Sequence, residues 1–301
     1  MWYNTIELFL VGGHKLSVLF CDTDCELWYT SADELGVDVI KMPYIVDGEE
    51  YLYDLGRETD FVEFFNKMKK GSKVVTAGLN ESAYIEYFEP YFKKGEDILY
   101  IAFSSKMSST FIHMDHAVAM LHEKYPNVKF KRFDTLNICL GAGILVYLGA
   151  KYFNSHNCDI DKTYEYLESI RDKVSILFVV DDLIYLSRGG RISKTKATIA
   201  NVMHIKPILT VNKDGEIDIE TKVNGLKKAY RYILNKVLET YANIDDAPIY
   251  IVDADNAEVG DALEKDVKEN IEGASIIRQP IGPVIGAHCG PGTYGVIFMH
   301  K

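Results

Sequence analysis

The hydrophobic positions in the first half of the chain form short apolar runs that alternate with longer helical patterns. The apolar runs predict buried strands at 15–22, 37–46, 97–103 and 128–134, and the helical patterns predict helices at 60–70, 110–125 and 140–153. The first of these helices has an apolar face formed by Phe61, Phe64, Phe65 and Met68. Strands that alternate with helices at this spacing predict an α/β fold, with a mainly parallel sheet flanked by helices.

The second half of the chain has a different pattern. It predicts a strand at 175–182, a hairpin at 206–223 around Asp214-Gly215, an amphipathic helix at 225–241, and strands at 248–253 and 293–299 on either side of a helix at 256–270. The polar stretch NSHNCDIDKT separates the two halves. We therefore expect two α/β domains, residues 1–165 and 166–301.

Charge and composition narrow the classes of partner. The 301 residues include 33 Lys and Arg against 44 Asp and Glu, a net charge of −11, which disfavours nucleic acid and anionic membranes. The N-terminal residues lack the pattern of a signal peptide, and no stretch approaches the ~18 apolar residues of a membrane span. We expect a cytoplasmic protein without stable membrane insertion.

Neither the cysteines nor the acidic residues near the N-terminus form a metal-binding motif. The five cysteines are odd in number and scattered, which indicates reduced thiols. Cys21 and Cys25 lack the further ligands of a zinc site, and Asp22 and Asp24 are only a weak signature of Mg²⁺. We expect no metal and no cofactor.

Two hydroxyl-bearing segments each lie between an apolar run and a helix. SSKMSST (104–110) follows a predicted strand, at the edge where α/β sheets bind ligands, and its Ser108, Ser109 and Thr110 could bind a carboxylate or phosphate. An ordinary helix N-cap explains one of these hydroxyls equally well. Thr76 in VVTAGLN could face the same crevice or serve only as a turn residue.

A basic segment, YLSRGGRISKTK (185–196), interrupts this acidic chain. Arg188 before Gly189-Gly190 fits the C-terminal end of a helix. That interpretation leaves Arg191, Lys194 and Lys196 without a role. The segment could bind an anionic headgroup or an acidic partner surface.

The last candidate is GPVIGAHCGPGTYGVIF (282–298). We interpret it as extended, and adjacent residues would then place His288 and Cys289 on opposite faces, so they are poor catalytic partners. Its glycines do not match a P-loop. What remains is an imidazole on a permissive backbone, able to donate to an anion. The residues alone predict a two-domain α/β protein that binds a small anion.

Read together, these segments resemble the DegV family of bacterial fatty-acid-binding proteins. SSKMSST resembles the family's S-S-x-L-S-G-T, YLSRGGRIS matches Y-L-x-x-G-G-R-I-S, and residues 205–209 match I-K-P-I-L. Residues 281–293 match I-G-P-V-I-x-x-H-x-G-P-G-T, residues 22–27 echo D-S-T-x-D-L, and residues 43–54 echo P-x-x-V-x-x-x-x-x-Y-x-D. The matches run in order over residues 15–298.

The resemblance implies two α/β domains with a ligand tunnel between them, where an apolar chain lies and a carboxylate is held by hydroxyl groups. It implies that the protein is not an enzyme and has no catalytic residue, but presents a long-chain fatty acid to a separate fatty acid kinase, which makes acyl-phosphate for phospholipid synthesis. The implied carboxylate-binding residues are Thr76, Ser105, Ser108, Thr110, Arg188 and His288. The implied kinase-docking residues are Arg188, Arg191, Lys194 and Lys196.

The chain departs from the family pattern at three places. Ala77-Gly78-Leu79 stands where many members have S-Q-P, Ser109 replaces a glycine, and Asp253 replaces a histidine in an H-A-D segment. Two alternatives therefore stay open. One is an acyl hydrolase or transferase that uses His288 with a serine or cysteine, and the other is a carrier of another anionic lipid.

Overall fold

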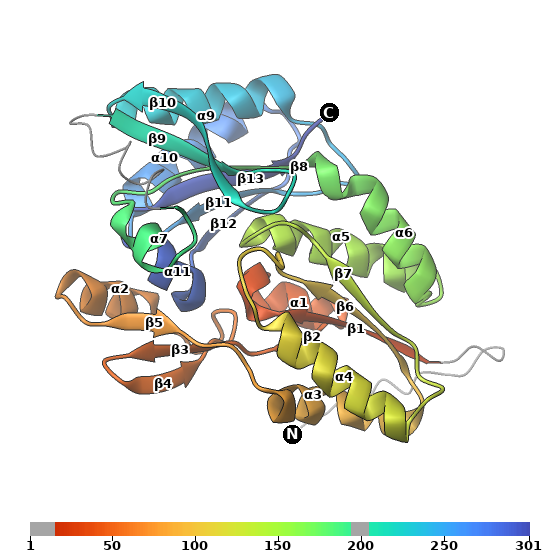
Figure 1. The fold of residues 1–301 in the computed structure, drawn as a ribbon. Coiled ribbons are helices and arrows are strands. Elements are labelled where there is room, and N and C mark those ends of the chain that lie inside the picture. Colours follow the sequence, from red (N-terminus) through yellow and green to blue (C-terminus); the bar gives the residue numbers. More distant parts are fainter. Residues whose placement is uncertain (1–15, 194–204) are drawn as a thin grey trace, which may run out of the picture.

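The computed structural model describes residues 16–193 and 205–301, which fold around two large sheets and a small one (Figure 1). The first large sheet is wholly parallel, as predicted. Its strands in spatial order are β2 (Asp38–Ile40), β1 (Ser17–Asp22), β6 (Asp97–Ala102) and β7 (Phe130–Asp134). The predictions of strands at 15–22, 97–103 and 128–134 are confirmed.

Helices cover both faces of this sheet, which confirms the predicted architecture. On one side lie α3 (Glu81–Lys94) and α4 (Phe111–Lys124), and on the other lie α1 (Tyr29–Leu35), α5 (Leu140–Ser155) and α6 (Ile160–Ile170) (Figure 1). The predicted helices at 110–125 and 140–153 correspond to α4 and α5. The predicted domain boundary at residue 165 lies within α6, which packs against β6 and β7. The division into residues 1–165 and 166–301 stays a prediction.

The second large sheet has six strands of mixed direction. In spatial order these are β10 (Ile217–Asn224), β9 (Ile205–Val211), β8 (Val174–Val179), β13 (Tyr294–Met299), β11 (Ile249–Asp253) and β12 (Ile276–Pro280). Strands β9 and β10 form the predicted hairpin. The predicted helices at 225–241 and 256–270 are α9 (Leu226–Thr240) and α10 (Ala257–Asn270), whose apolar faces pack on the outer side of the sheet.

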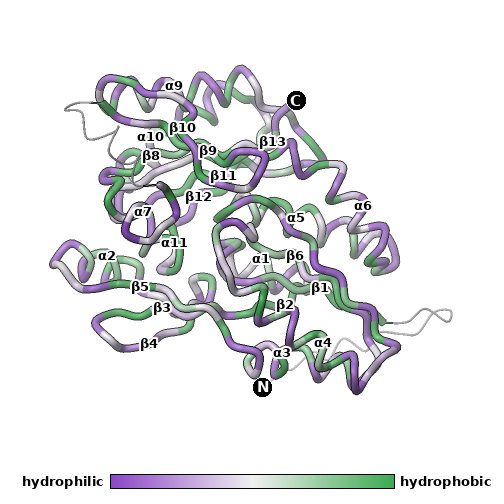
Figure 2. Tube along the Cα trace, viewed as in Figure 1, coloured by the Kyte–Doolittle hydropathy of each residue, from purple (hydrophilic) through white to green (hydrophobic). Residues whose placement is uncertain are grey.

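Helix α5 lies between the two large sheets and contacts β6, β8 and β13. It is apolar nearly all round and almost completely buried, as expected for a helix covered on both sides. A side chain at Gly141 would overlap Ile176 of β8, so glycine allows the helix to approach the second sheet closely. Figure 2 shows hydrophobic residues gathered in α5 and the strands beside it.

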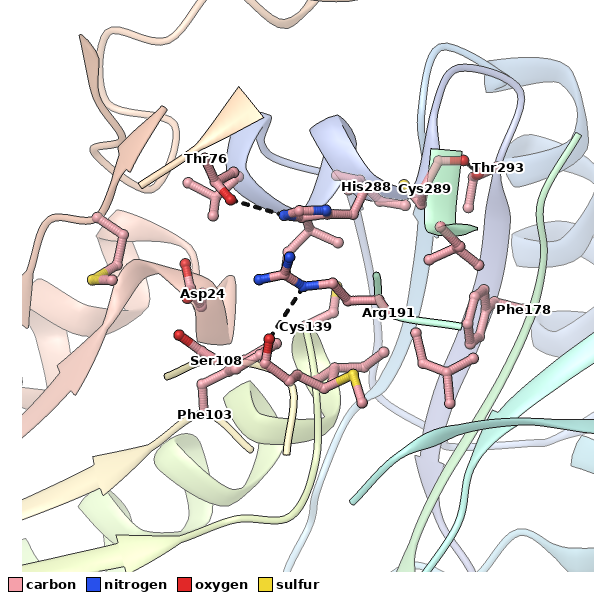
Figure 3. A pocket seen from close by; sticks show the side chains of 18 of the residues that line it. Asp24, Thr76, Phe103, Ser108, Cys139, Phe178, Arg191, His288, Cys289 and Thr293 are labelled. Carbon is pink, nitrogen blue, oxygen red and sulfur yellow. Dashed lines mark hydrogen bonds between the residues drawn. The ribbon is translucent and has the colours of Figure 1, made fainter. Parts of the chain in front are cut away.

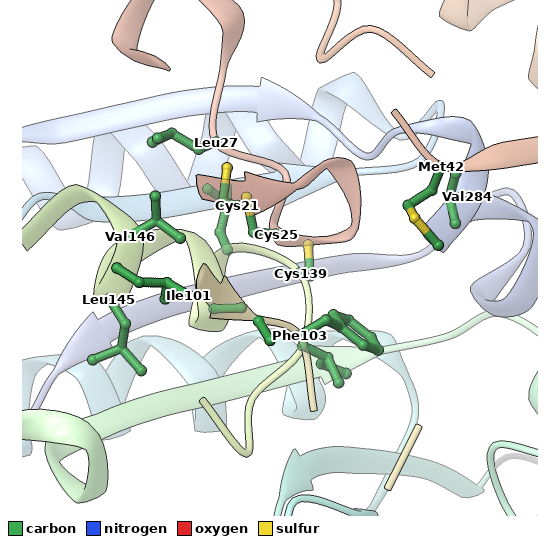
Figure 4. Packing of buried hydrophobic residues seen from close by; sticks show 14 of the residues in the cluster. Cys21, Cys25, Leu27, Met42, Ile101, Phe103, Cys139, Leu145, Val146 and Val284 are labelled. Carbon is green, nitrogen blue, oxygen red and sulfur yellow. The ribbon is translucent and has the colours of Figure 1, made fainter. Parts of the chain in front are cut away.

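Cysteines take part in this core as apolar side chains. Cys21, Cys25 and Cys139 are buried among residues such as Ile101 and Val146 (Figure 4). All five cysteines of the chain are free thiols. Burial raises the pKa of Cys25 and Cys139 well above the ordinary thiol value, so both stay protonated.

The predicted strand at 37–46 is wrong as a single element. Strand β2 ends at Ile40, and β3 (Pro43–Val46) begins a separate antiparallel sheet with β4 (Glu49–Leu52) and β5 (Val74–Thr76). Between β2 and β3 the backbone hydrogen-bonds to a side chain instead of to a neighbouring strand: the N–H of Met42 donates to the Thr23 hydroxyl at 2.9 Å. The small sheet carries α2 (Phe61–Lys69), which confirms the predicted helix at 60–70.

The expectation that residues 282–289 are extended is also wrong. Residues Pro283–Cys289 form the short helix α11. Proline suits the first helical position because its fixed φ is already helical and no intrahelical N–H is lost there. Gly290, with φ of 77°, ends the helix. The N–H of Gly282 is bound by the Glu26 carboxyl at 3.0 and 3.1 Å, which ties α11 to the first sheet.

Among the described residues no helix is both long and apolar enough to cross a membrane.

Candidate functional site

A cavity of about 250 Å³ lies between the two large sheets, with one apolar end and one polar end. The apolar end is built on the inner face of the second sheet (Figure 3). Its main walls are Ile176 and Phe178 of β8, Ile217 of β10, Val252 of β11 and Ile297 of β13. These side chains offer no polar group to a ligand.

The polar end begins with a hydroxyl–imidazole pair that links distant parts of the chain. Thr76, the last residue of β5, has its Oγ1 2.9 Å from Nε2 of His288 in the last turn of α11. Burial and the positive charge of Arg191 lower the pKa of His288 to about 4, so the imidazole is neutral at neutral pH. A side chain at Gly189 would overlap the imidazole, so this glycine makes room for His288.

The loop before α4 brings further hydroxyl groups to the same end. Ser108, Ser109 and Thr110 all line the cavity. The Thr110 hydroxyl lies 2.6 Å from the hydroxyl of the buried Tyr84. Thr110 is the N-cap residue of α4, but its side chain makes no capping hydrogen bond. The Ser108 hydroxyl is 3.4 Å from the Thr110 N–H, a long and weak contact. Helix capping therefore accounts for little of this serine-rich sequence.

Arg191 lies in the cavity wall. Helix α7 (Ile184–Arg188) ends where the basic segment predicts, and Gly190, with φ of 73°, turns the chain. The guanidinium of Arg191 then points inward, with Nε donating to the Met107 carbonyl at 3.1 Å (Figure 3). Arg188 is exposed and does not line the cavity.

The two arginines thus lie differently from what the sequence predicts. The resemblance assigned Arg188 to both the carboxylate and partner docking, and Arg191 to partner docking alone, whereas the cavity wall contains Arg191 and not Arg188. Ser105 is also outside the cavity wall, and its backbone N–H is bound by Asp134 at 3.3 Å. Lys194 and Lys196 lie outside the described residues.

Three buried acidic residues, Asp22, Asp24 and Glu26, lie at the end of β1 and just after it, next to the polar end. Asp22 accepts a hydrogen bond from the Tyr100 hydroxyl, and burial raises its pKa to about 6. Glu26 accepts hydrogen bonds from the Tyr53 hydroxyl at 2.9 Å and from Gly282, and burial raises its pKa to about 8. Glu26 is thus a protonated acid at neutral pH.

Asp24 is the one of these three acids that lines the cavity. Burial raises its pKa well above the ordinary value, Asp22 and Glu26 add to the shift where they are ionised, and the positive charge of Arg191 opposes it. From the sequence, Asp24 is only a weak candidate for a metal ligand. Across residues 16–193 and 205–301 no cluster of three or more His, Cys, Asp or Glu side chains could hold a metal ion.

Cys289 also lines the cavity, but its chemistry does not fit a nucleophile. Its Sγ contacts the carbonyls of Gly286 and Gly290 at 4.0 and 3.8 Å, and burial raises the pKa of the thiol to about 12. His288 is bound to Thr76 rather than to Cys289. The pair therefore lacks the thiolate and the base contact that covalent catalysis requires.

A family model described as an uncharacterised protein of the DegV family matches residues 18–301. The chain belongs to the DegV family. A DegV domain-containing protein of Clostridium perfringens is 34% identical over 285 residues, which cover 95% of this chain and 98% of the relative.

Solved DegV structures share the fold. A fatty acid binding DegV family protein from Streptococcus agalactiae is 24% identical, with a TM-score of 0.82, and the match covers 96% of this chain and 100% of that one. A DegV family protein from Eubacterium eligens, loaded with heptadecanoic acid, is 18% identical, with a TM-score of 0.79 and coverage of 95% and 100%.

The departures from the DegV sequence pattern differ in their distance from the cavity. Ala77, Gly78 and Ser109 all line it. Asp253 does not, and its carboxylate is bound by Arg278 at 2.7 Å. The changes after Thr76 therefore bear on the ligand's environment, whereas the change at Asp253 is part of a separate ion pair.

Proposed function

We propose that this protein binds a long-chain fatty acid in the cavity, with the carboxylate at the polar end and the acyl chain against the second sheet. The observation that carries the proposal is the division of one cavity into an apolar end and an end with hydroxyl, imidazole and guanidinium groups. Solved DegV structures that are described as binding fatty acids support it.

The proposed carboxylate contacts are the hydroxyls of Thr76 and Ser108, the neutral imidazole of His288 and the guanidinium of Arg191. A carboxylate needs hydrogen-bond donors, and bonds to a charged acceptor are stronger than neutral ones. Thr110 lies beside these groups, and its hydroxyl is held by the contact with the Tyr84 hydroxyl. Ser105 and Arg188 lie outside the cavity wall, so this set of headgroup contacts does not include them.

The acyl chain supplies most of the affinity in this proposal. Each methylene moved from water to an apolar wall contributes about 0.8 kcal/mol, so a long chain gains far more than the headgroup does. The polar end then determines orientation and selects carboxylates over other headgroups.

The same proposal makes the protein a cytoplasmic carrier rather than an enzyme, which presents its ligand to a separate fatty acid kinase. The exposed Arg188, with Lys194 and Lys196, would contact that kinase. These basic residues favour an acidic surface on the kinase, and the net charge of −11 disfavours nucleic acid as a partner.

A second function has one observation in its favour. The Thr76–His288 contact has the geometry of a hydroxyl nucleophile with its base, as in an acyl hydrolase. A pKa of about 4 makes His288 a weak base at neutral pH, which counts against this function. A carrier of another anionic lipid needs only the same polar end.

Native mass spectrometry of the purified protein tests the proposal. A retained mass equal to one long-chain fatty acid is the expected result, and a cavity that stays empty after incubation with palmitate contradicts it. Incubation with an acyl ester distinguishes a carrier from a hydrolase, because only the hydrolase would cleave the ester. Ester cleavage by the wild type that is lost in His288→Ala would show that the protein is a hydrolase rather than a carrier.

A further inference from the structure

Asp24 is a buried acid whose hydrogen bonding is incomplete. Its side chain is 6% exposed, and its Oδ1 atom is buried without a hydrogen-bond partner in the described part of the chain. The neighbouring acids differ, because Asp22 and Glu26 each accept hydrogen bonds from protein groups. A buried polar atom without a partner is unfavourable, and Asp24 also lines the cavity, so a ligand group that hydrogen-bonds to this carboxyl group would offset part of that cost.

The position of Asp24 places it on the headgroup of the proposed ligand. It follows β1 in a short 3-10 turn, Thr23–Cys25, and lines the cavity together with Thr76, Ser108 and His288. Figure 3 shows Asp24 beside Ser108 and across from the guanidinium of Arg191. A carboxylate held by the hydroxyl groups and Arg191 would therefore lie next to a second carboxyl group.

We propose that Asp24 holds one proton between its own carboxyl group and the carboxylate of the bound fatty acid. This inference rests on the proposed function, since it requires an anionic headgroup at the polar end. Ionising both of two carboxyl groups in contact is energetically unfavourable, because like charges repel each other strongly in a site from which the ligand has displaced water. One proton removes that repulsion and creates a hydrogen bond.

The charges around Asp24 make a second negative charge unfavourable. The titratable groups that face it are Asp22 and Glu26 on its own segment, Tyr84 of α3, Tyr100 of β6, Cys139 before α5, Arg191 after α7, and His288 and Cys289 of α11. Arg191 is the one cation in this set of described groups at neutral pH, because the pKa of His288 is lowered to about 4. One guanidinium cannot balance both Asp24 and the ligand.

The proton balance gives a measurable linkage. An ionised Asp24 and a fatty-acid carboxylate take one proton from solvent, which forms an O–H bond on the carboxyl pair. No other bond forms or breaks. Above the pH at which Asp24 ionises in the free protein, affinity should fall about tenfold per pH unit, because each ligand then requires one proton from solution.

Calorimetric titration of palmitate into lipid-free protein, in pairs of buffers with different ionisation enthalpies, measures this proton directly. Uptake should rise towards one proton per ligand as the pH increases past the point at which Asp24 ionises in the free protein. Asp24→Asn carries a permanent amide donor and should bind without proton uptake. At the alkaline end it should bind at least about tenfold more tightly than the wild type.

Matched variants separate the possible sources of a proton. Asp115→Asn removes the same charge from an exposed residue that pairs with Arg132, and it should keep the wild-type uptake. His288→Gln should also keep it. Uptake that persists in Asp24→Asn and disappears in His288→Gln would assign the proton to His288 and overturn the inference.

Two results distinguish this inference from the function on which it rests. If palmitate binds the wild type without proton uptake at every pH measured, the proposed role of Asp24 is wrong and the proposed function stands. Palmitate that fails to bind the wild type sinks the proposed function. Should Asp24→Asn not fold, Asp24→Thr keeps a hydroxyl donor and must likewise lose the proton uptake.

Discussion

The two ends of the cavity are built in different ways. The apolar end comes from four strands of one sheet, whose side chains need only be hydrophobic and fill space. The polar end combines residues from β5, the loop before α4, the turn after α7 and α11, each fixed by a specific partner. In the proposed function, affinity and selectivity are therefore separable, because the apolar end would supply most of the affinity and the polar end would determine the selectivity.

A charge at the apolar end should have the largest effect on this division. Ile217→Asp places a carboxylate on the edge strand β10, where the side chain is 5% exposed. We expect palmitate affinity to fall about 100-fold or more, because the charge must be desolvated when the acyl chain enters. Titration calorimetry measures the loss. Ile217→Val is the matched control and should change affinity little, and an unaffected Ile217→Asp would place the acyl chain elsewhere.

Removing donors at the polar end should have the next largest effect. The double variant Thr76→Val with Ser108→Ala removes two hydroxyl groups, and we expect palmitate affinity to fall about 30-fold, because hydrogen bonds to a charged group contribute about 1.5–3 kcal/mol each and the losses overlap. Binding assays with palmitate and its methyl ester provide the test. The ester should lose much less, and equal losses for both ligands would show that the variant damages the cavity rather than the headgroup contacts.

Beneath the polar end, Glu26 gives a prediction about stability. Burial raises its pKa from 4.5 to about 8, so the folded state keeps a proton that the unfolded chain releases. This contribution is fully present below about pH 4.5 and is lost as the pH rises through about pH 8. Within that window Glu26 lowers the free energy of unfolding by about 1.4 kcal/mol per pH unit.

Denaturant unfolding of the wild type and of Glu26→Gln at several pH values tests this linkage. The difference in unfolding free energy between the two should grow in favour of the variant as the pH rises. A difference that stays constant with pH would mean that Glu26 is ionised in the folded protein.

The two arginines of the basic segment should show the smallest and most selective effects. Arg191→Ala should weaken palmitate binding only about fivefold. The guanidinium already donates hydrogen bonds to the Met107 and Gly189 carbonyls, so fewer of its N–H groups are available to the ligand. Arg188→Glu should leave palmitate binding unchanged and slow phosphorylation of the bound acid by a fatty acid kinase. If Arg188→Glu weakens binding and Arg191→Ala does not, the roles of the two residues are exchanged.

The sequence predicted the layers of the fold well because strand and helix periodicities are local. The parallel strands at 15–22, 97–103 and 128–134 and the helices at 225–241 and 256–270 all appear. It failed at 37–46, because whether one apolar run forms one strand or two depends on a distant partner, the Thr23 hydroxyl. It also failed at 282–289, where proline and glycine suggested extended chain but occupy the start and end of a helix.

The candidate site was predictable as a set of segments rather than as a set of contacts. Thr76, Ser108, Thr110 and His288 are brought to one cavity, although 212 residues separate Thr76 from His288 along the chain. The direction of a side chain after Gly189-Gly190 depends on backbone angles that the sequence does not reveal, so Arg188 and Arg191 could not be distinguished. Asp24 was visible in DTDCEL, but its missing partner became apparent only in three dimensions.

Helix α5 does not line the cavity, yet it limits the size of the ligand that the cavity can hold. Its Gly141 leaves no room beside Ile176, and Ile176 is itself a wall of the binding space. A side chain at Gly141 would displace the Ile176 side chain, which forms part of the cavity wall, or move the helix away from the second sheet. Glycine at this position therefore helps to set the width of the cavity from outside it, without contacting anything that the cavity would hold.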